Sequence, residues 1–120
     1  MGGSLYIHAF GAYFGLGLVL AYKFKKANDN PWNCVGYYSS VFAFIGTLFL
    51  FLFWPSFNSA LASGNGRQRI LVNTFFSITS SAFMTFIIVP FMNNGKFTID
   101  NILNSVIAGG VILGASADLI

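Results

Sequence analysis

The 120-residue chain is 56% hydrophobic and only 8% charged, and its formal net charge is +3. Soluble domains carry about 25% charged residues, so this composition excludes an ordinary soluble fold and indicates a protein dissolved in lipid. The positive charge does not indicate nucleic-acid binding, because the six basic residues lie beside apolar segments and form no patch interleaved with aromatic residues.

Four apolar segments follow one another along the chain, each close to the ~20 residues that a helix needs to cross a hydrocarbon core. Turn-prone polar stretches separate them: KFKKANDNPWNC, SGNGRQR and NNGKFTIDN. The pattern predicts an all-α membrane protein with four transmembrane helices, approximately over residues 4–22, 36–55, 70–92 and 102–120. The first segment is not predicted to be a secretory signal peptide, because no Lys or Arg precedes it and no cleavage pattern follows before KFKK.

The basic residues predict the orientation of these helices. With four helices, the first and third connections lie on the same side of the membrane. They carry four of the six basic residues, Lys23, Lys25, Lys26 and Lys96, whereas the second connection carries Arg67 and Arg69. Cytoplasmic connections are enriched in Lys and Arg. We therefore expect the first and third connections to be cytoplasmic and the second to face outside.

Small and polar residues recur at helical spacing on each predicted helix. Such residues let membrane helices approach closely and hydrogen-bond across the contact, so we expect these stripes to be packing faces. The remaining faces, rich in Phe, Leu, Ile and Val, are expected to contact lipid or further helices. In chain order the stripes are Ser4, His8, Gly11 and Gly15; Ser40, Ala43 and Thr47; Asn73, Ser77, Ser81 and Thr85; and Asn104, Ala108, Ala115 and Asp118, beside Gly109 and Gly110.

Two ionisable residues within the predicted spans require more than packing, because such groups are rare in lipid and usually face the protein interior or a conduit. His8 is the only histidine in the chain, and a neutral imidazole both donates and accepts a hydrogen bond. From the residues alone, His8 either bridges two helices or lines a conduit. Asp118 lies near the end of its helix, where we expect a solvated or capped carboxylate.

The sequence contains no constellation typical of catalysis or metal binding. Its single cysteine, Cys34, offers neither a disulfide framework nor a metal-ligand spacing, and we expect an inert residue rather than a palmitoylation site. The other carboxylates, Asp29 and Asp100, lie in connections, and SGNGRQR lacks the preceding strand of a phosphate-binding loop. We expect neither an enzyme nor a cofactor.

Five segments in a fixed order carry a family resemblance: IHAFGAYFGL, GTLFLFLFWPSFNSA, RQRILVNT, GKFTIDNILNSVIAGG and GASAD. They resemble segments of the Rhesus-type branch of the ammonium transporter superfamily, most specifically in IHAFGAYFGL and WPSFNSA. Members of that family are homotrimers of subunits with eleven or twelve helices, and each subunit encloses a narrow apolar pore. The resemblance implies that this chain is a central piece, corresponding to the fifth through eighth helices.

The resemblance also implies roles for individual residues. His8 matches the first of the family's two pore histidines, and Phe57 matches one of two stacked phenylalanines that close the outer end of the pore. The second histidine, the partner phenylalanine and an acidic residue that the family places shortly before the first histidine have no counterpart here. Asn104, Gly109 and Gly110 match positions in the eighth helix, for which we expect packing only.

On this basis we expect an integral, multi-pass protein of the plasma membrane whose full-length form conducts ammonia or ammonium, with carbon dioxide as a further candidate. The alternative is a non-conducting structural or assembly partner, since some Rhesus-type relatives have lost the pore histidines. Retention of His8 favours conduction. We expect the chain alone to insert into the membrane without enclosing a pore, because its small-residue faces would lack partners.

Overall fold

The computed structural model describes residues 2–22, 30–31, 34 and 36–119, and the described part is built from helices without any strand. This confirms the prediction of an all-α fold. In chain order the elements are the π-helix η1 (Ser4–Ala9), which runs directly into α1 (Phe10–Tyr22), then α2 (Tyr37–Ser59), α3 (Asn65–Met92) and α4 (Ile99–Ile112).

Three of the four predicted helices end or begin elsewhere than expected. The helix α2 continues past Pro55, because membrane helices re-satisfy the one backbone group that an internal proline frees. The helix α3 begins inside the polar stretch SGNGRQR, because backbone hydrogen bonding extends it beyond its apolar residues. The helix α4 stops at Ile112, and residues 113–119 form turns. The prediction of a helix over residues 102–120 is therefore wrong for residues 113–119.

Length decides which helices can cross a membrane alone. Three are long and apolar enough, namely Ser4–Tyr22, Tyr37–Ser59 and Asn65–Met92. The helix α4 has 14 residues, which corresponds to about 21 Å at 1.5 Å per residue and falls short of a hydrocarbon core about 30 Å thick. The expected fourth full-length span is thus not formed by α4 itself.

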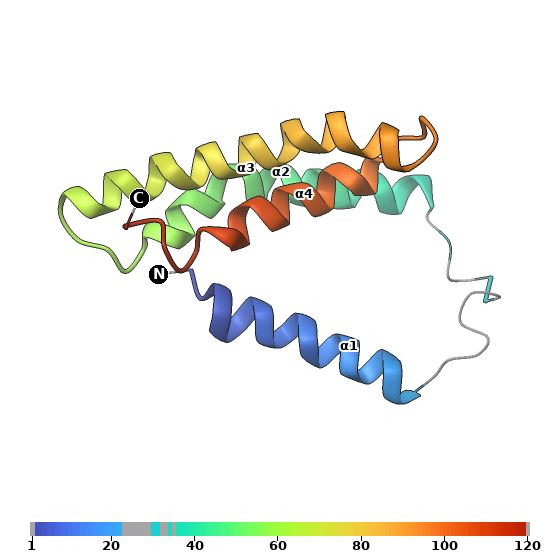
Figure 1. Cartoon of the computed structure of the whole chain (residues 1–120), viewed down its shortest axis with the longest axis horizontal. Helices are drawn as coiled ribbons and strands as arrows, with labels where there is room; N and C mark the ends of the chain where they lie inside the picture. The colour runs from blue at the N-terminus through green and yellow to red at the C-terminus, as the bar shows by residue number, and fades with distance from the viewer. Residues whose placement is uncertain (1, 23–29, 32–33, 35, 120) are drawn as a thin grey trace.

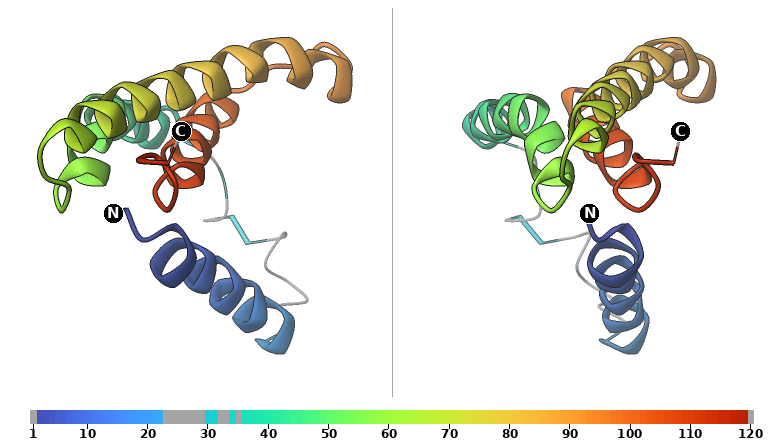
Figure 2. Two further views of the ribbon diagram at one scale, coloured as in Figure 1. Left: turned by 60° about the vertical axis from the view of Figure 1, so that its left-hand side comes forward. Right: turned by 90° about the vertical axis from the view of Figure 1, so that its left-hand side faces the viewer.

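The helices α2, α3 and α4 pack side by side, as the views of Figures 1 and 2 agree. Their shared core consists of Trp54, Ile78 and Val106, flanked by Phe51 and Val111. The connection between α2 and α3 lies at one end of this bundle, whereas the connection between α3 and α4 lies at the other, next to the start of α2 (Figure 1). This arrangement fits the expected alternation of the connections between two membrane faces.

The contact between α3 and α4 uses the polar stripe predicted for the third helix. Ser77 Oγ donates a hydrogen bond to the carbonyl oxygen of Gly109 at 2.8 Å, and Ser81 Oγ donates to that of Ser105 at 2.8 Å. Thr85 Oγ1 instead donates to the carbonyl oxygen of Ser81 on its own helix. Serine side chains therefore join the two helices by bonds to backbone oxygens.

The packing face of α4 differs from the predicted one. Asn104, Ala108 and Ala115 are exposed, whereas Gly109 is buried against α3. A Cβ at Gly109 would lie only 2.8 Å from Ile78 Cα. The close backbone approach requires glycine, and it rotates the predicted stripe away from α3.

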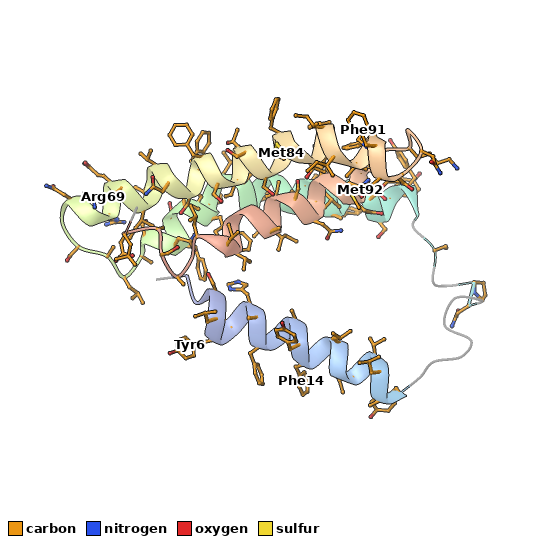
Figure 3. All side chains as sticks on the ribbon, in the orientation of Figure 1. Tyr6, Phe14, Arg69, Met84, Phe91 and Met92 are labelled. Atoms are coloured by element: carbon orange, nitrogen blue, oxygen red, sulfur yellow. The ribbon has the colours of Figure 1, made fainter. Side chains whose placement is uncertain are left out.

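The helix α1 diverges from the bundle and approaches it only at its N-terminal end (Figures 1 and 2). The π-helix η1 contacts α4, whereas a Cβ at Gly11 or Gly15 would meet nothing within 4 Å. The small-residue stripe predicted for this segment thus contacts the bundle only through its first half. Exposed Tyr6, Phe14 and Phe91 point away from the helix contacts (Figure 3), as expected for surfaces that face lipid or further helices.

Candidate functional site

The chain's N-terminal segment fixes the position of His8. Ser4 Oγ donates a hydrogen bond to the carbonyl oxygen of Val111 at the end of α4. A Cβ at Gly114 would lie 2.5 Å from Ser4 Oγ, and a Cβ at Gly2 would lie 1.9 Å from Asn58 Oδ1. These glycines let the segment before η1 lie directly against α2 and the turn after α4.

The π-helical turn determines the direction of the imidazole. The backbone nitrogens of Ile7 and His8 lie 2.9 and 3.4 Å from the same oxygen, the carbonyl oxygen of Gly3. His8 Nδ1 lies 3.4 Å from that oxygen as well. A carbonyl oxygen only accepts, so this contact fits the tautomer that carries its proton on Nδ1 and leaves Nε2 as an acceptor.

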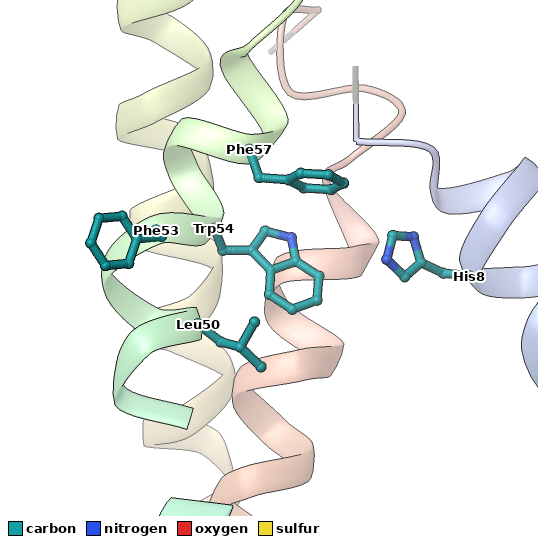
Figure 4. Close-up of a pocket in the computed structure, with 5 residues that line it drawn as sticks. All are labelled: His8, Leu50, Phe53, Trp54 and Phe57. Atoms are coloured by element: carbon teal, nitrogen blue, oxygen red, sulfur yellow. The ribbon is translucent and has the colours of Figure 1, made fainter. Parts of the chain in front are cut away.

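His8 faces an open pocket of about 300 Å³ that it lines together with Leu50, Phe53, Trp54 and Phe57 of α2 (Figure 4). The centroid of the His8 ring lies 5.8 Å from that of Trp54 and 6.5 Å from that of Phe57, and the latter pair is nearly perpendicular at 87°. Apart from the imidazole, every side chain that lines this pocket is apolar or aromatic. The structure therefore brings the two sequence-predicted pore residues, His8 and Phe57, together.

A second groove, of about 400 Å³, lies on the other side of His8, between the first helical segment and α4. Its walls include Ala12 from α1 and the exposed Asn104 and Ala108 from α4. Asn104 therefore lies on the groove wall shared with His8, not in the contact between α3 and α4. Its predicted role as a packing residue is not matched by a contact within the described residues.

The remaining residues singled out in the sequence lie away from the pocket opening. Gly109 and Gly110 are buried, Gly109 against α3 and Gly110 against the indole of Trp54. Asp118 is half-buried, and its Oδ1 is buried with no hydrogen-bond partner among the described residues. The turn after α4 folds Asp118 back toward α3, where Arg69 Nη1 donates to its backbone oxygen at 3.4 Å. The expected solvated or capped carboxylate therefore stays a prediction, with one of its two oxygens buried.

Sequence reasoning missed Trp54, whose ring centroid lies 5.8 Å from that of His8 and 6.3 Å from that of Phe57, so that the three rings form a triangle. Only 8% of Trp54 is exposed. A usable signal was present, because Leu50, Phe53, Trp54 and Phe57 have the i, i+3, i+4, i+7 spacing of one helix face. Within the described part of the chain, no group of three His, Cys, Asp or Glu residues is arranged to hold a metal ion.

Apolar helices long enough to span a bilayer, together with an aromatic pocket whose single ionisable group is an imidazole, define a helical membrane protein with a candidate site at that imidazole. Comparison with known proteins identifies the family. The model of the Ammonium Transporter Family matches residues 1–120, and the chain belongs to that family.

The relatives that the chain resembles are of the Rhesus type. It is 42% identical over 121 residues to the mouse (Mus musculus) ammonium transporter Rh type B, covering 98% of this chain and 27% of the relative. It is 43% identical over 120 residues to the zebrafish (Danio rerio) ammonium transporter Rh type C-like 2, covering 98% and 25%. The chain thus spans about a quarter of the length of these curated relatives. No solved structure matches it significantly.

Proposed function

We propose that the protein to which this chain belongs conducts ammonia or ammonium across a membrane through an apolar pore, and that the pocket between η1 and α2 is part of that pore. The observation that carries the proposal is the imidazole of His8 facing Trp54 and Phe57 in a pocket whose other lining side chains are apolar or aromatic. Membership of the ammonium transporter family supports it.

The chemistry of the pocket suits this solute. An aromatic face such as that of Phe57 attracts a small cation by about 0.5–2 kcal/mol as the cation loses water. An apolar conduit strongly disfavours the charged form beyond that point, so that the neutral molecule is the form that passes. An unprotonated Nε2 atom of His8 can accept a hydrogen bond from an N–H group of ammonia or ammonium.

Several finer features belong to the same proposal and rest on the family resemblance. The parent protein forms a homotrimer in the plasma membrane, and carbon dioxide, which is also small and uncharged, is a second candidate solute. The chain alone does not enclose a pore, because α1 lies apart from the other helices and leaves the groove beside Asn104 open.

The test is uptake of methylammonium by yeast cells that lack their own ammonium transporters. Three proteins are compared: this chain, the chain completed with the remaining helices of a close relative, and the completed protein with His8→Ala. The matched control is Tyr6→Ala, which alters the same π-helix but removes a side chain that is 89% exposed.

We expect uptake by the completed protein, loss of uptake with His8→Ala at equal surface expression, and retained uptake with Tyr6→Ala. Uptake that is unchanged without the imidazole would return His8 to a packing role. A well-expressed completed protein that takes up nothing would favour the alternative, a structural or assembly partner in the membrane.

A further inference from the structure

We infer that Gly110 is a specificity-determining residue: the absence of a side chain at this position sets how far the indole of Trp54 stands from His8, and so sets the width of the pocket. The inference rests on the proposed conduction through this pocket. Gly110 lies on α4 and does not line the pocket itself, so that it acts only through the position of Trp54.

The indole lies almost in contact with the backbone of Gly110. A Cβ at this position would lie 2.5 Å from both Cδ2 and Cε2 of Trp54, and 2.7 Å from its Nε1. These distances are far below van der Waals contact, which is about 3.5–4.0 Å between carbon atoms. Any residue other than glycine therefore requires either α4 or the indole to move.

The backbone of α4 is tied by side-chain hydrogen bonds to both α2 and α3. Asn58 Nδ2, on a fully buried residue, donates to the carbonyl oxygen of Gly110 at 3.1 Å. Ser77 Oγ donates to the carbonyl oxygen of the preceding residue, Gly109, at 2.8 Å. Movement of α4 away from Trp54 would stretch or break these buried bonds, and the loss of buried hydrogen bonds is costly.

The indole is also held on its inner side. Trp54 packs with Ile78 and Val106 in the core of the bundle, and Ile78 is completely buried. The remaining side of the ring lines the pocket opposite His8, and the pocket is the open space next to the ring. A methyl group at position 110 is therefore expected to push the ring into the pocket and to bring it closer to the imidazole.

The neighbouring Gly109 provides a matched control. A Cβ at Gly109 would lie 2.8 Å from Ile78 Cα and 2.9 Å from the carbonyl oxygen of Ser77, which belong to α3 and not to the pocket. The same substitution one position earlier thus disturbs the contact between α3 and α4, and it reaches Trp54 only indirectly, through Ile78. The two variants separate a change in pocket width from a general loss of packing.

The experiment measures ammonium and methylammonium uptake by the full-length parent, because these solutes differ by one methyl group. We expect Gly110→Ala to lower the methylammonium-to-ammonium ratio by about tenfold, the discrimination that one such group brings in a fitted pocket. We expect Gly109→Ala to leave the ratio unchanged, and the pair Gly110→Ala with Trp54→Phe to restore it, because a smaller ring offsets the added methyl.

A second readout does not depend on conduction. In parent protein labelled with 5-fluorotryptophan, the ¹⁹F resonance of Trp54, assigned by its loss in Trp54→Phe, should shift with Gly110→Ala and not with Gly109→Ala. A shift without uptake by the unsubstituted protein would contradict the proposed function but support the contact. If the Gly110→Ala protein does not assemble, Trp54→Phe alone should raise the methylammonium-to-ammonium uptake ratio.

Three results would overturn the inference. One is an unchanged uptake ratio in assembled Gly110→Ala, and another is an equal change in Gly109→Ala. The third, relevant where Gly110→Ala does not assemble, is a ratio that Trp54→Phe alone does not raise.

Discussion

Asn58 Nδ2 donates hydrogen bonds to the carbonyl oxygen of Gly110 at 3.1 Å and to Thr74 Oγ1 at 3.2 Å. One fully buried amide therefore ties α2 to both α3 and α4. Because Asn58 directly follows Phe57 in the chain, the same tie fixes the part of α2 that carries the aromatic wall of the pocket.

Replacing Asn58 should destabilise the bundle. The change Asn58→Ala leaves a buried carbonyl oxygen unpaired and is expected to cost about 1–3 kcal/mol. Asn58→Asp keeps the size but places a buried carboxylate oxygen against the carbonyl oxygen of Gly110, and only the Thr74 hydroxyl can turn to donate to it, so we expect at least the same loss. The measurement is the Tm of the detergent-solubilised parent. Asn93→Ala, which removes only an exposed bond to the Lys96 carbonyl oxygen, is the control and should leave the Tm unchanged.

The serines of α3 are expected to contribute less each. Removing the hydroxyl of Ser77 or Ser81 breaks one interhelical bond, which in membrane proteins is worth about 0.6 kcal/mol. The double variant should show the sum of the two losses in a reversible unfolding titration in mixed micelles. Ser80→Ala changes an exposed residue of the same helix and should have no effect; an equal loss there would contradict the role of these bonds.

The ring of Phe57 is expected to attract the ammonium or methylammonium cation before that cation loses its proton. Phe57→Leu keeps an apolar wall but removes the aromatic face, so KM for methylammonium should rise by about 2- to 30-fold, the equivalent of 0.5–2 kcal/mol of cation–π attraction. Kinetics of uptake in yeast would measure this. Phe42→Leu alters a phenylalanine that is 73% exposed on the same helix, and a similar rise there would remove the case for Phe57.

The orientation predicted from the basic residues can be tested with single cysteines. In a Cys34→Ser background, which removes the free thiol of the chain, Arg67→Cys should react with a membrane-impermeant maleimide added to intact cells, and Lys96→Cys should react only after permeabilisation. These positions lie in α3's first turns and in the connection after α3. Labelling in the reverse pattern would invert the topology.

Much of the fold follows from apolar length alone, and the first helical segment shows why. Residues 4–22 are predominantly apolar and are followed by a basic stretch, so the extent of the span is visible in the sequence. The end of α4 is not visible in this way. The chain turns after Ile112 because Gly114 packs against Ser4, a contact between residues more than a hundred positions apart.

The residues of the candidate site likewise differ in whether the sequence reveals them. His8 stands out because an ionisable group in an apolar run is costly. Trp54 does not, because an aromatic residue near a helix end is also typical of the membrane interface. Its burial depends on the missing side chain of Gly110, on another helix. The contact between Trp54 and Gly110 is a tertiary contact between two helices, and the helical periodicity of the sequence does not predict it.

The π-helix that carries His8 lets one turn hold one residue more than an α-helical turn holds. A π-turn closes i to i+5 rather than i to i+4, and here the carbonyl oxygen of Gly3 approaches the backbone nitrogen of His8. Deleting one residue between them would let His8 close an ordinary i to i+4 turn on the same oxygen. A relative with a one-residue gap at this turn is therefore expected to keep its imidazole facing Trp54, although the spacing of its sequence motif differs.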